Sequence, residues 1–127
     1  LCRMISDPHE LDVVVMPNLY GDIISDGAAG LIGGLGLAPS GCYGDDYAYF
    51  ESAHGTAPDI ASQNIINPTA TILSACMMLE YLAFEEAAIK LKSSLSQIYA
   101  EGNLLTKDQG GSATTTQFCD AIKGLIE

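Results

Sequence analysis

The chain has 127 residues, of which 48% are hydrophobic and 17% are charged, and its formal net charge is −11. This length suits one domain of ordinary size, and the apolar fraction excludes an intrinsically disordered chain. Five basic residues against sixteen acidic ones exclude the basic surface that nucleic acids and anionic membranes require. We therefore expect a soluble, acidic globular protein with no nucleic-acid partner and no membrane partner.

Four cysteines are spread widely over the chain, and no two of them form a Cys-x-x-Cys pair. Because tetrahedral zinc sites usually draw two ligands from one short turn, this spacing argues against a structural zinc. We expect reduced thiols and therefore a cytoplasmic or mitochondrial-matrix location. The chain begins at Leu1, so any targeting segment would lie upstream, and we expect the chain to be a piece of a longer protein.

The first third of the chain predicts one strand and one helix. The apolar, β-branched run 11–16 closes at Pro17, which is typical of a parallel strand that is buried on both faces. A helix should follow through 22–32, and the glycines between Gly30 and Gly36 should end it because glycine is a poor helix former.

A second strand is expected at 48–51, followed by a loop at 54–59. Asn67 suits the N-cap of the next helix and Pro68 its first position. This helix should continue to Leu82, and because it is apolar nearly all round we expect it to be buried.

The last third of the chain predicts two more helices. One should cover 85–101, where Gly102 supplies a stop. Thr114 and Gln117 form a capping-box pattern ahead of the other. Strands that alternate with helices indicate the α/β class, although so few strands imply that part of the sheet is missing.

Asp22 and Asp26 are the sharpest candidates for metal binding. On a helix they would lie on one face, about 5–6 Å apart at Cβ, and no Lys or Arg lies between Arg3 and Lys90 to neutralise them in sequence. A hard cation such as Mg²⁺ or Mn²⁺ would relieve the repulsion, and ligands of open α/β sheets bind just beyond strands such as the one expected at 11–16. The alternative is a solvated acidic start of a helix, where the helix dipole favours aspartate.

The loop that begins at His54 is a candidate nucleotide site. Gly55 and Thr56 would let backbone N–H groups approach a phosphate or a flat base. Asp59 could accept a hydrogen bond from a ribose diol, and its carboxylate would repel a 2′-phosphate. The alternative for His54 is a surface or hydrogen-bonded structural histidine.

The glycine cluster from Gly30 to Gly36 does not form a dinucleotide fingerprint. That fingerprint needs glycine or alanine where this chain has Pro39, and no strand directly precedes the cluster. Flexible backbone or close helix packing is the better interpretation.

Four ordered motifs resemble the decarboxylating dehydrogenases, the family of isocitrate, isopropylmalate, homoisocitrate and tartrate dehydrogenases. They lie at 18–26, 33–40, 54–61 and 67–70, and read Asn-Leu-Tyr-Gly-Asp-Ile-Ile-Ser-Asp, Gly-Gly-Leu-Gly-Leu-Ala-Pro-Ser, His-Gly-Thr-Ala-Pro-Asp-Ile-Ala and Asn-Pro-Thr-Ala. The stretch 105–111 extends the likeness over nearly the whole chain. The residues of the first two motifs look closest to those of the NAD-dependent isocitrate dehydrogenases.

The resemblance implies a fold and a set of residue roles. The fold would be the C-terminal part of the two-domain isocitrate/isopropylmalate dehydrogenase-like α/β fold, which is not a Rossmann fold. Asp22 and Asp26 match aspartates that hold Mg²⁺ or Mn²⁺ against the substrate's hydroxyl and carboxylate. The residues that match the family's NAD site are Glu51 on the nicotinamide side, His54, Gly55, Thr56 and Ala57 around the adenosine, Asn67 at the adenine through its backbone, and Asp59 with Ile60 as the NAD-type pair.

The resemblance also implies a reaction and a domain division. A 2-hydroxy acid, most simply isocitrate, would be oxidised by NAD⁺ and would then lose CO₂, with the metal charge stabilising the developing enolate. Residues 1–33 would end the substrate and dimer domain, and 34–127 would form the C-terminal part of the nucleotide-binding domain.

The family's substrate-binding arginines and its catalytic tyrosine and lysine belong to a part upstream of Leu1. The resemblance therefore implies a chain that is inactive alone and that belongs to a homodimer or larger oligomer. Without its sheet partners, the chain should expose apolar surface at 13–15 and along 72–82.

Three alternatives stay open. Isopropylmalate dehydrogenase differs mainly in substrate contacts that lie upstream. A non-catalytic regulatory subunit of isocitrate dehydrogenase would tend to lose the aspartate pair and the His-Gly-Thr-Ala loop, and both are intact here. An acidic metal-binding module unrelated to the family would bind its cation even after Asp26→Asn.

Overall fold

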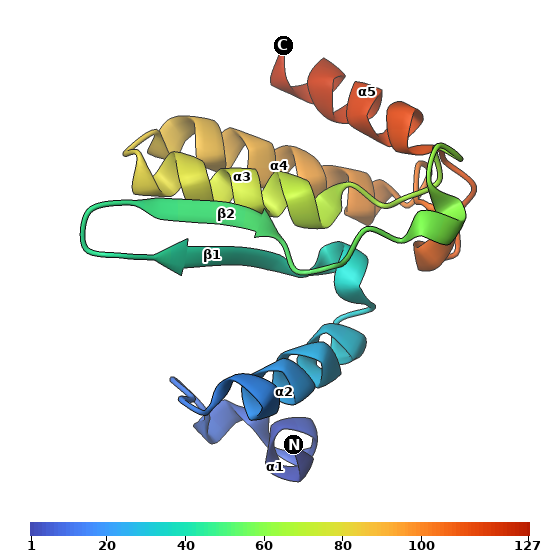
Figure 1. Cartoon of the computed structure of the whole chain (residues 1–127). Helices are drawn as coiled ribbons and strands as arrows, with labels where there is room; N and C mark the ends of the chain where they lie inside the picture. Colours follow the sequence, from blue (N-terminus) through green and yellow to red (C-terminus); the bar gives the residue numbers. More distant parts are fainter.

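The structure is a computed structural model that describes residues 1–127. Its regular elements, drawn in Figure 1, are α1 (Cys2–Ser6), α2 (Asn18–Leu31), β1 (Pro39–Tyr43), β2 (Ala48–Ser52), α3 (Thr69–Tyr81), α4 (Glu85–Glu101) and α5 (Thr115–Ile126). Short 3₁₀ turns lie between them, namely η1 (Pro8–Glu10), η2 (Leu35–Leu37), η3 (Pro58–Ile60) and η4 (Lys107–Gln109).

The elements after residue 34 pack in layers. The β1–β2 hairpin lies against α3, α3 packs on α4, and α4 packs on α5 (Figure 1). Helices α1 and α2 lie on the far side of the hairpin from α5, and α2 meets the layered part through η2. The chain thus combines helices with a small sheet, as the expected α/β class requires.

The hairpin packs closely against α3 at a glycine. The strands are antiparallel, with Gly41 opposite Phe50. A Cβ on Gly41 would lie 3.0 Å from both Met77 Cε and Phe50 Cδ1, so a side chain at this position would make both neighbours shift. Tyr43, Phe50 and Tyr81 form an aromatic cluster at one end of this contact, with ring centroids 5.5–5.9 Å apart. The strand predicted at 48–51 is confirmed, whereas the glycine-containing strand β1 was missed.

The main apolar core lies between α4 and α5. Its buried members are Leu95 and Ile98 from α4 and Phe118 and Ile122 from α5. The spacing of these residues is the helical spacing that the sequence predicted for both segments. Helix α4 covers Glu85–Glu101 and ends at Gly102 with φ of 68°, so this prediction is confirmed.

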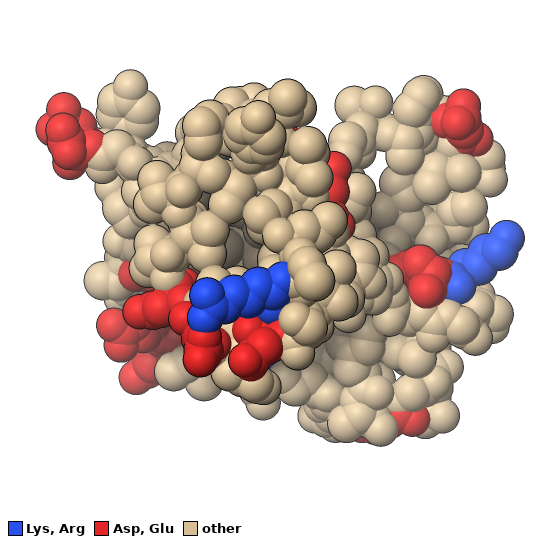
Figure 2. Space-filling view, turned by 90° about the horizontal axis from the view of Figure 1, so that it is seen from below, with Lys and Arg blue, Asp and Glu red and all other residues tan.

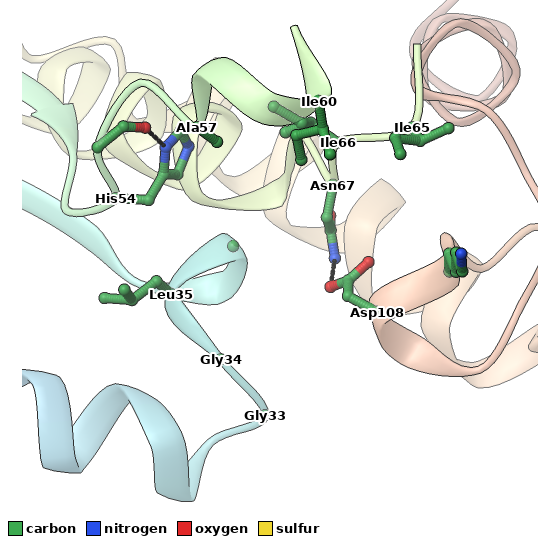
Figure 3. Close-up of a pocket in the computed structure, with 13 residues that line it drawn as sticks. Gly33, Gly34, Leu35, His54, Ala57, Ile60, Ile65, Ile66, Asn67 and Asp108 are labelled. Carbon is green, nitrogen blue, oxygen red and sulfur yellow. Dashed lines mark hydrogen bonds between the residues drawn. The ribbon is translucent and has the colours of Figure 1, made fainter. Parts of the chain in front are cut away.

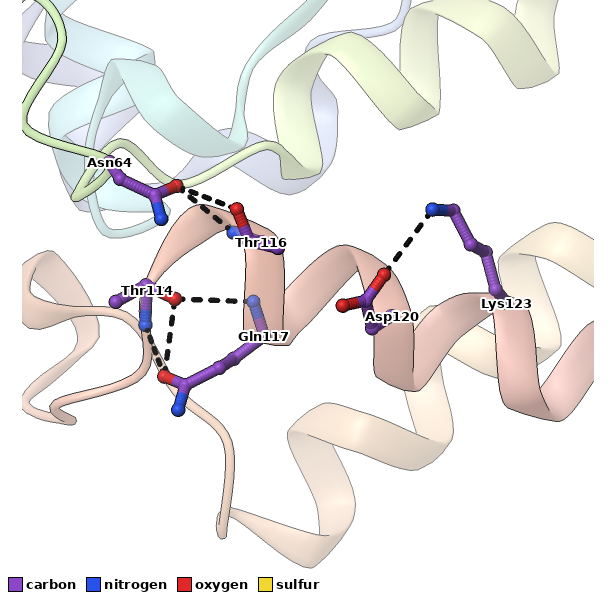
Figure 4. A network of polar contacts seen from close by, with 6 residues as sticks. All are labelled: Asn64, Thr114, Thr116, Gln117, Asp120 and Lys123. Atoms are coloured by element: carbon purple, nitrogen blue, oxygen red, sulfur yellow. Dashed lines mark hydrogen bonds and ion pairs between the residues drawn. The ribbon is translucent and has the colours of Figure 1, made fainter.

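The predicted capping box of α5 is also confirmed. The Thr114 Oγ1 accepts a hydrogen bond from the Gln117 backbone N–H at 3.2 Å, and the Thr114 N–H donates to Gln117 Oε1 at 2.9 Å (Figure 4). Beside it, the N–H and hydroxyl of Thr116 both donate to Asn64 Oδ1. These bonds tie the start of α5 to the loop before α3.

The strand predicted at 11–16 is wrong. The segment is irregular, and Val13 and Val15 are 81% and 89% exposed. A parallel strand must pair with strands that are distant in the chain, and the only sheet here is the β1–β2 hairpin. The expectation that 13–15 would expose apolar surface is therefore confirmed, for the reason given for it.

The helix predicted from Asn67 to Leu82 is α3, which begins two residues later and ends one residue earlier. The Asn67 Oδ1 accepts from the Thr69 N–H at 3.0 Å, so Asn67 caps the first turn although the helix is assigned from Thr69. The prediction that this helix is buried holds at Ala70, Ser74 and Cys76 and is wrong for its last turn. Met78, Tyr81 and Leu82 are exposed there, which confirms for 78–82 the expectation of exposed apolar surface along 72–82. None of the helices has the length and apolar character needed to span a bilayer.

Candidate nucleotide cleft and acidic pair

A cleft of about 800 Å³ lies between η2 and the loop that follows β2. Its lining comes from segments far apart in the sequence, namely Gly33, Gly34, Leu35, Gly36, His54, Gly55, Ala57, Ile60, Ile65, Ile66, Asn67, Lys107 and Asp108 (Figure 3). Glycines and isoleucines make this lining largely apolar, and a volume of about 300–1,000 Å³ is typical of small-molecule sites.

The structure brings together five of the eight residues predicted for the cofactor. These are His54, Gly55, Ala57, Ile60 and Asn67. They converge because Ala57, at φ of 42°, turns the chain sharply into η3.

The other three residues predicted for the cofactor do not line the cleft. Glu51 is an exposed residue of β2, and Thr56 and Asp59 are exposed in the loop. The Asp59 carbonyl accepts a hydrogen bond from Gln63 Nε2 at 2.9 Å, which fixes the backbone of η3.

His54 belongs to the cleft through its ring. Its Nδ1 lies 2.9 Å from the carbonyl oxygen of Gly55, and Figure 3 shows the ring beside Ala57. Because a carbonyl only accepts hydrogen bonds, Nδ1 carries the proton in this contact. The contact leaves Nε2 as the ring's acceptor when the imidazole is neutral.

Asn67 is the most connected residue of the cleft wall. It is 3% exposed, and its Nδ2 donates to Asp108 Oδ2 at 2.9 Å and to the Tyr99 hydroxyl at 3.1 Å. Its Oδ1 accepts from the Thr69 N–H. The side chain of Asn67 is thus fully engaged within the wall.

Asp108 is the carboxylate of the cleft. Its Oδ2 also accepts from Gln109 Nε2 at 3.1 Å, and its Oδ1 accepts from the Thr106 hydroxyl at 2.6 Å. Partial burial acts to raise the pKa of Asp108, but the hydrogen bonds from Thr106, Asn67 and Gln109 outweigh it and hold the pKa below its usual value. The group is therefore ionised at neutral pH.

Gln109 joins this polar wall to the link between α2 and η2. Its Nε2 also donates to the carbonyl oxygen of Gly33 at 3.2 Å. Gly33 and Gly34 have φ of 113° and 126°, backbone conformations that residues other than glycine rarely adopt. The two glycines thus turn the chain from α2 into the cleft.

The aspartate pair lies on α2, outside the cleft. Asp22 and Asp26 are both exposed, and Asp22 Oδ2 accepts from Asn18 Nδ2 at 3.2 Å. No group of three or more His, Cys, Asp and Glu side chains is placed to hold a metal ion. Two carboxylates one helical turn apart, with no basic neighbour, suit a hard cation as a partial ligand set, since Mg²⁺ is commonly held by one or two carboxylates.

The thiols do not form a reactive centre. All four cysteines are free, and Cys76 is buried in α3. Burial raises the pKa of the Cys76 thiol, with Glu80 adding to the increase and Lys92 opposing it, so this group stays protonated and unreactive at neutral pH.

Charge elsewhere is predominantly negative. On the face seen in Figure 2, acidic groups are scattered over the surface and the few basic side chains lie next to acidic ones. Ion pairs join Lys92 to Glu80 and Lys123 to Asp120. Lys107, in the cleft lining, has no acidic partner within ion-pair distance.

Sequence reasoning gave no role to Lys107 or Asp108. Both lie in the 105–111 stretch that carried the family resemblance, but no spacing rule connects that stretch to the loop after His54. Only the fold, which brings η4 beside Asn67, shows that they share one cleft.

The fold and the cleft define an α/β protein with one large, glycine-rich cleft of small-molecule size. The family model described as isocitrate/isopropylmalate dehydrogenase matches residues 1–122. The chain belongs to the isocitrate/isopropylmalate dehydrogenase family.

Individual relatives agree with this membership. The chain is 54% identical over 123 residues to the mitochondrial isocitrate dehydrogenase [NAD] catalytic subunit 5 of Arabidopsis thaliana, which covers 95% of this chain and 33% of that protein. It is 53% identical over 119 residues to the 3-isopropylmalate/3-methylmalate dehydrogenase of Methanocaldococcus jannaschii, covering 94% of this chain and 35% of that one. The chain thus spans about a third of the length of these relatives.

A solved structure supports the same fold. The crystal structure of isocitrate dehydrogenase from Methylococcus capsulatus superimposes with a TM-score of 0.91 at 41% identity, over 98% of this chain and 38% of that one. The predicted fold, a part of the isocitrate/isopropylmalate dehydrogenase-like fold, is therefore confirmed.

Proposed function

We propose that this chain supplies the adenosine-binding cleft and two metal-binding aspartates of an NAD-dependent, decarboxylating 2-hydroxy-acid dehydrogenase, with isocitrate as its substrate. The observation that carries the proposal is the cleft. Four residues of the loop after His54, together with Asn67, line one hollow of about 800 Å³ in a chain of this family.

The chemistry of the cleft suits an adenosine. Ile60 and Ile66 offer apolar contact to a flat base, and Gly36 and Gly55 leave the backbone open to close approach. The backbone of Asn67 would pair with the adenine edge, because its side chain is already hydrogen-bonded within the wall.

Asp22 and Asp26 would hold a divalent cation, Mg²⁺ or Mn²⁺. When bound, such a cation supplies positive charge that stabilises the negative charge developing as CO₂ leaves the oxidised substrate. The aspartates themselves act as oxygen ligands, and Asn18 restrains Asp22 through its hydrogen bond.

We further propose that residues 1–33 and 34–127 belong to different domains of the enzyme, as the resemblance implies. Support comes from the positive φ angles of Gly33 and Gly34, which redirect the chain after α2. The enzyme would be a homodimer or larger oligomer in the cytoplasm or the mitochondrial matrix, in keeping with the mitochondrial relative named above.

Cofactor binding is tested by titrating the chain with NAD⁺ and with AMP by isothermal calorimetry. Both ligands should bind, and Gly36→Val should abolish binding, because a Cβ at Gly36 would already lie 3.3 Å from Asn67 Cβ and 3.6 Å from Asp108 Oδ2. Gly124→Val, where nothing lies within 4 Å of a Cβ, is the matched control. Absence of binding by the unaltered chain would refute the cleft assignment.

The choice between NAD⁺ and NADP⁺ is tested at Asp59 and Ile60. A carboxylate near the ribose repels a 2′-phosphate, so the double variant Asp59→Lys, Ile60→Tyr should shift the affinity ratio toward NADP⁺. Asp46→Lys, in the hairpin turn, adds the same charge away from the cleft. An unchanged ratio in the double variant would show that Asp59 does not select the cofactor.

Metal binding is tested by NMR with Mn²⁺, whose paramagnetism broadens signals from nearby residues. Signals of α2 around Asp22 and Asp26 should broaden first, and Asp22→Asn or Asp26→Asn should weaken the effect. Asp45→Asn in the hairpin turn should not. Broadening that survives Asp26→Asn unchanged would favour an unrelated acidic metal-binding surface.

Substrate choice requires the whole enzyme. In a chimera, this chain replaces the matching 38% of the Methylococcus capsulatus isocitrate dehydrogenase. Isocitrate turnover with NAD⁺ and Mn²⁺ should be retained and should collapse on Asp22→Asn. Lack of turnover in a folded, oligomeric chimera would favour the regulatory-subunit alternative.

Isopropylmalate dehydrogenase remains the second candidate, because the Methanocaldococcus jannaschii relative of that name is 53% identical. In the chimera, the substrate contacts expected upstream come from the isocitrate enzyme. Because each chimera takes these contacts from its donor, the chain is also joined to the matching upstream part of the Methanocaldococcus jannaschii protein, and the chimera that keeps more of its donor's own turnover indicates the candidate that the chain fits better.

A further inference from the structure

Tyr99 of α4 reaches the wall of the cleft from behind. Its hydroxyl accepts a hydrogen bond from Asn67 Nδ2 at 3.1 Å and shares another with Thr69 Oγ1 at 2.8 Å. Tyr99 is half-buried and does not line the cleft. It lines a separate hollow of about 610 Å³ together with Leu73 and Gln109.

Asp108 and the Thr69 N–H fix which way the Asn67 amide points, and the Tyr99 hydroxyl adds a third hydrogen bond to the amide in that orientation. Two acceptors, the Tyr99 hydroxyl and Asp108 Oδ2, face the amide nitrogen, while the Thr69 N–H faces the amide oxygen. A flipped amide would set its oxygen against the Asp108 carboxylate and its NH₂ against the Thr69 N–H, so that neither contact could form a hydrogen bond. Asn67 is buried, so water cannot readily replace these bonds.

Holding the amide also holds the backbone at Asn67, a residue of the cleft lining. The turn from Asn67 through Pro68 to Thr69 starts α3, and Tyr99 contacts the side chains at both ends of it. The contact therefore links α4, which carries part of the core cluster, to Asn67 in the cleft lining, just before α3 begins.

We propose that Tyr99 is a positioning residue for nucleotide binding, acting through Asn67 and Thr69 without touching the ligand. The inference rests on the proposed adenosine site and extends it to a residue outside the cleft. The hydroxyl has this role, and the ring has a separate one, because the ring packs edge-on against Phe118 with centroids 5.9 Å apart. Removing the hydroxyl alone therefore separates positioning from core packing.

The test is Tyr99→Phe, with Tyr81→Phe as the matched control. Tyr81 also packs in an aromatic cluster, beside Tyr43 and Phe50, but it lies at the far end of α3 and contributes nothing to the cleft. For the 127-residue chain titrated with NAD⁺ and with AMP, Tyr99→Phe should raise Kd about 3- to 10-fold, the effect of one lost hydrogen bond. Tyr81→Phe should leave Kd unchanged.

A second measurement distinguishes positioning from general destabilisation. In ¹⁵N NMR of the free chain, Tyr99→Phe should speed hydrogen exchange of the Thr69 amide while exchange of core amides such as Ile98 stays the same. Thr69→Val should mimic the affinity loss, and Thr69→Ser, which keeps a hydroxyl, should restore it. The Tyr99→Phe, Thr69→Val double variant should lose less than the sum of the two.

The outcomes separate the two proposals. If the unaltered chain binds neither NAD⁺ nor AMP, the adenosine site fails and this inference fails with it. If the unaltered chain binds and Tyr99→Phe binds as tightly as Tyr81→Phe, the inference alone is overturned. A uniform increase of exchange across α4 would likewise overturn it, because the hydroxyl would then have only a stabilising role.

Discussion

The two ends of the chain differ sharply in how far they bury their apolar side chains. Before Gly34 only Ala29 is buried, and Val13 and Val15 are 81% and 89% exposed. In the C-terminal part, by contrast, Phe118 is fully buried between α4 and α5.

This difference reflects whether the packing partners of an element lie close to it in the sequence. Helix α3 packs on α4 and α4 packs on α5, so each of these helices finds a packing partner next to it in the sequence. A parallel strand at 11–16 needs strands from elsewhere in the sequence, as parallel pairs always do. An apolar run is thus a reliable sign of burial only when its partners are local.

The difference in burial is tested most strongly by truncating one apolar side chain in each region. Phe118→Ala should destabilise the chain by about 3–5 kcal/mol, the usual cost of removing a buried aromatic side chain. Val15→Ala should change stability by less than about 0.5 kcal/mol, because an exposed side chain loses almost nothing. Urea unfolding followed by circular dichroism measures both. Comparable losses would mean that residues 11–16 are buried in solution.

Substituting one glycine in each region tests the same difference in packing. A Cβ on Gly111 would lie 1.9 Å from the Leu105 carbonyl oxygen, whereas a Cβ on Gly30 meets nothing within 4 Å. Gly111→Ala should therefore open the 105–113 loop and cost about 2 kcal/mol, since the bonds from the N–H groups of Gly111 and Ala113 would be lost. Gly30→Ala should raise the helix content of α2, because alanine is the better helix former. Thermal unfolding and circular dichroism check both expectations, and a stable Gly111→Ala variant would contradict the first.

The secondary structure that the sequence predicted well is governed by local chemistry. The stop at Gly102 and the capping box at Thr114 depend only on residues within one or two turns, and both are confirmed. Strand β1 was missed because it contains Gly41, a poor strand residue by itself. Its place in the fold comes from its pairing with β2 and its packing on α3, where Gly41 lies close to Met77.

The candidate site was predicted in proportion to how local it is. The loop after His54 is continuous in sequence, so its residues were identified together. Asp108 and Tyr99 reach Asn67 from 41 and 32 residues away, and no periodicity links them. Their contribution depends on the packing of α4 and η4, which the sequence pattern does not encode.

The start of a helix offers a smaller contrast between the two regions. Helix α5 has a complete capping box, whereas α2 begins after Pro17 with no side-chain cap. Thr114→Ala should cost about 1 kcal/mol, because the Gln117 N–H near the helix start loses the hydroxyl to which it donates. Thr71→Ala, at an exposed position inside α3, is the control and should be neutral or slightly stabilising. An unchanged unfolding midpoint for Thr114→Ala would show that α5 is held by packing alone.

The smallest expected effect contrasts the carboxylates of the two regions. Asp108 accepts three side-chain hydrogen bonds that hold its pKa below the usual value, despite the opposing effect of partial burial. A group whose pKa is lower in the folded chain than in the unfolded chain stabilises the fold above the unfolded pKa, about 3.9 for aspartate, and this stability is lost as the pH falls below that value. Asp108→Asn should therefore be less stable than the unaltered chain at pH 7, and the difference should shrink as the pH falls from about 4 toward 2.

Asp26, whose side chain is exposed on α2, gives the control, and Asp26→Asn should keep the acid-dependent step of the unaltered chain. Urea midpoints measured across this pH range decide between them: a difference that stays constant for Asp108→Asn would mean that its hydrogen bonds favour the charged and the protonated carboxyl equally.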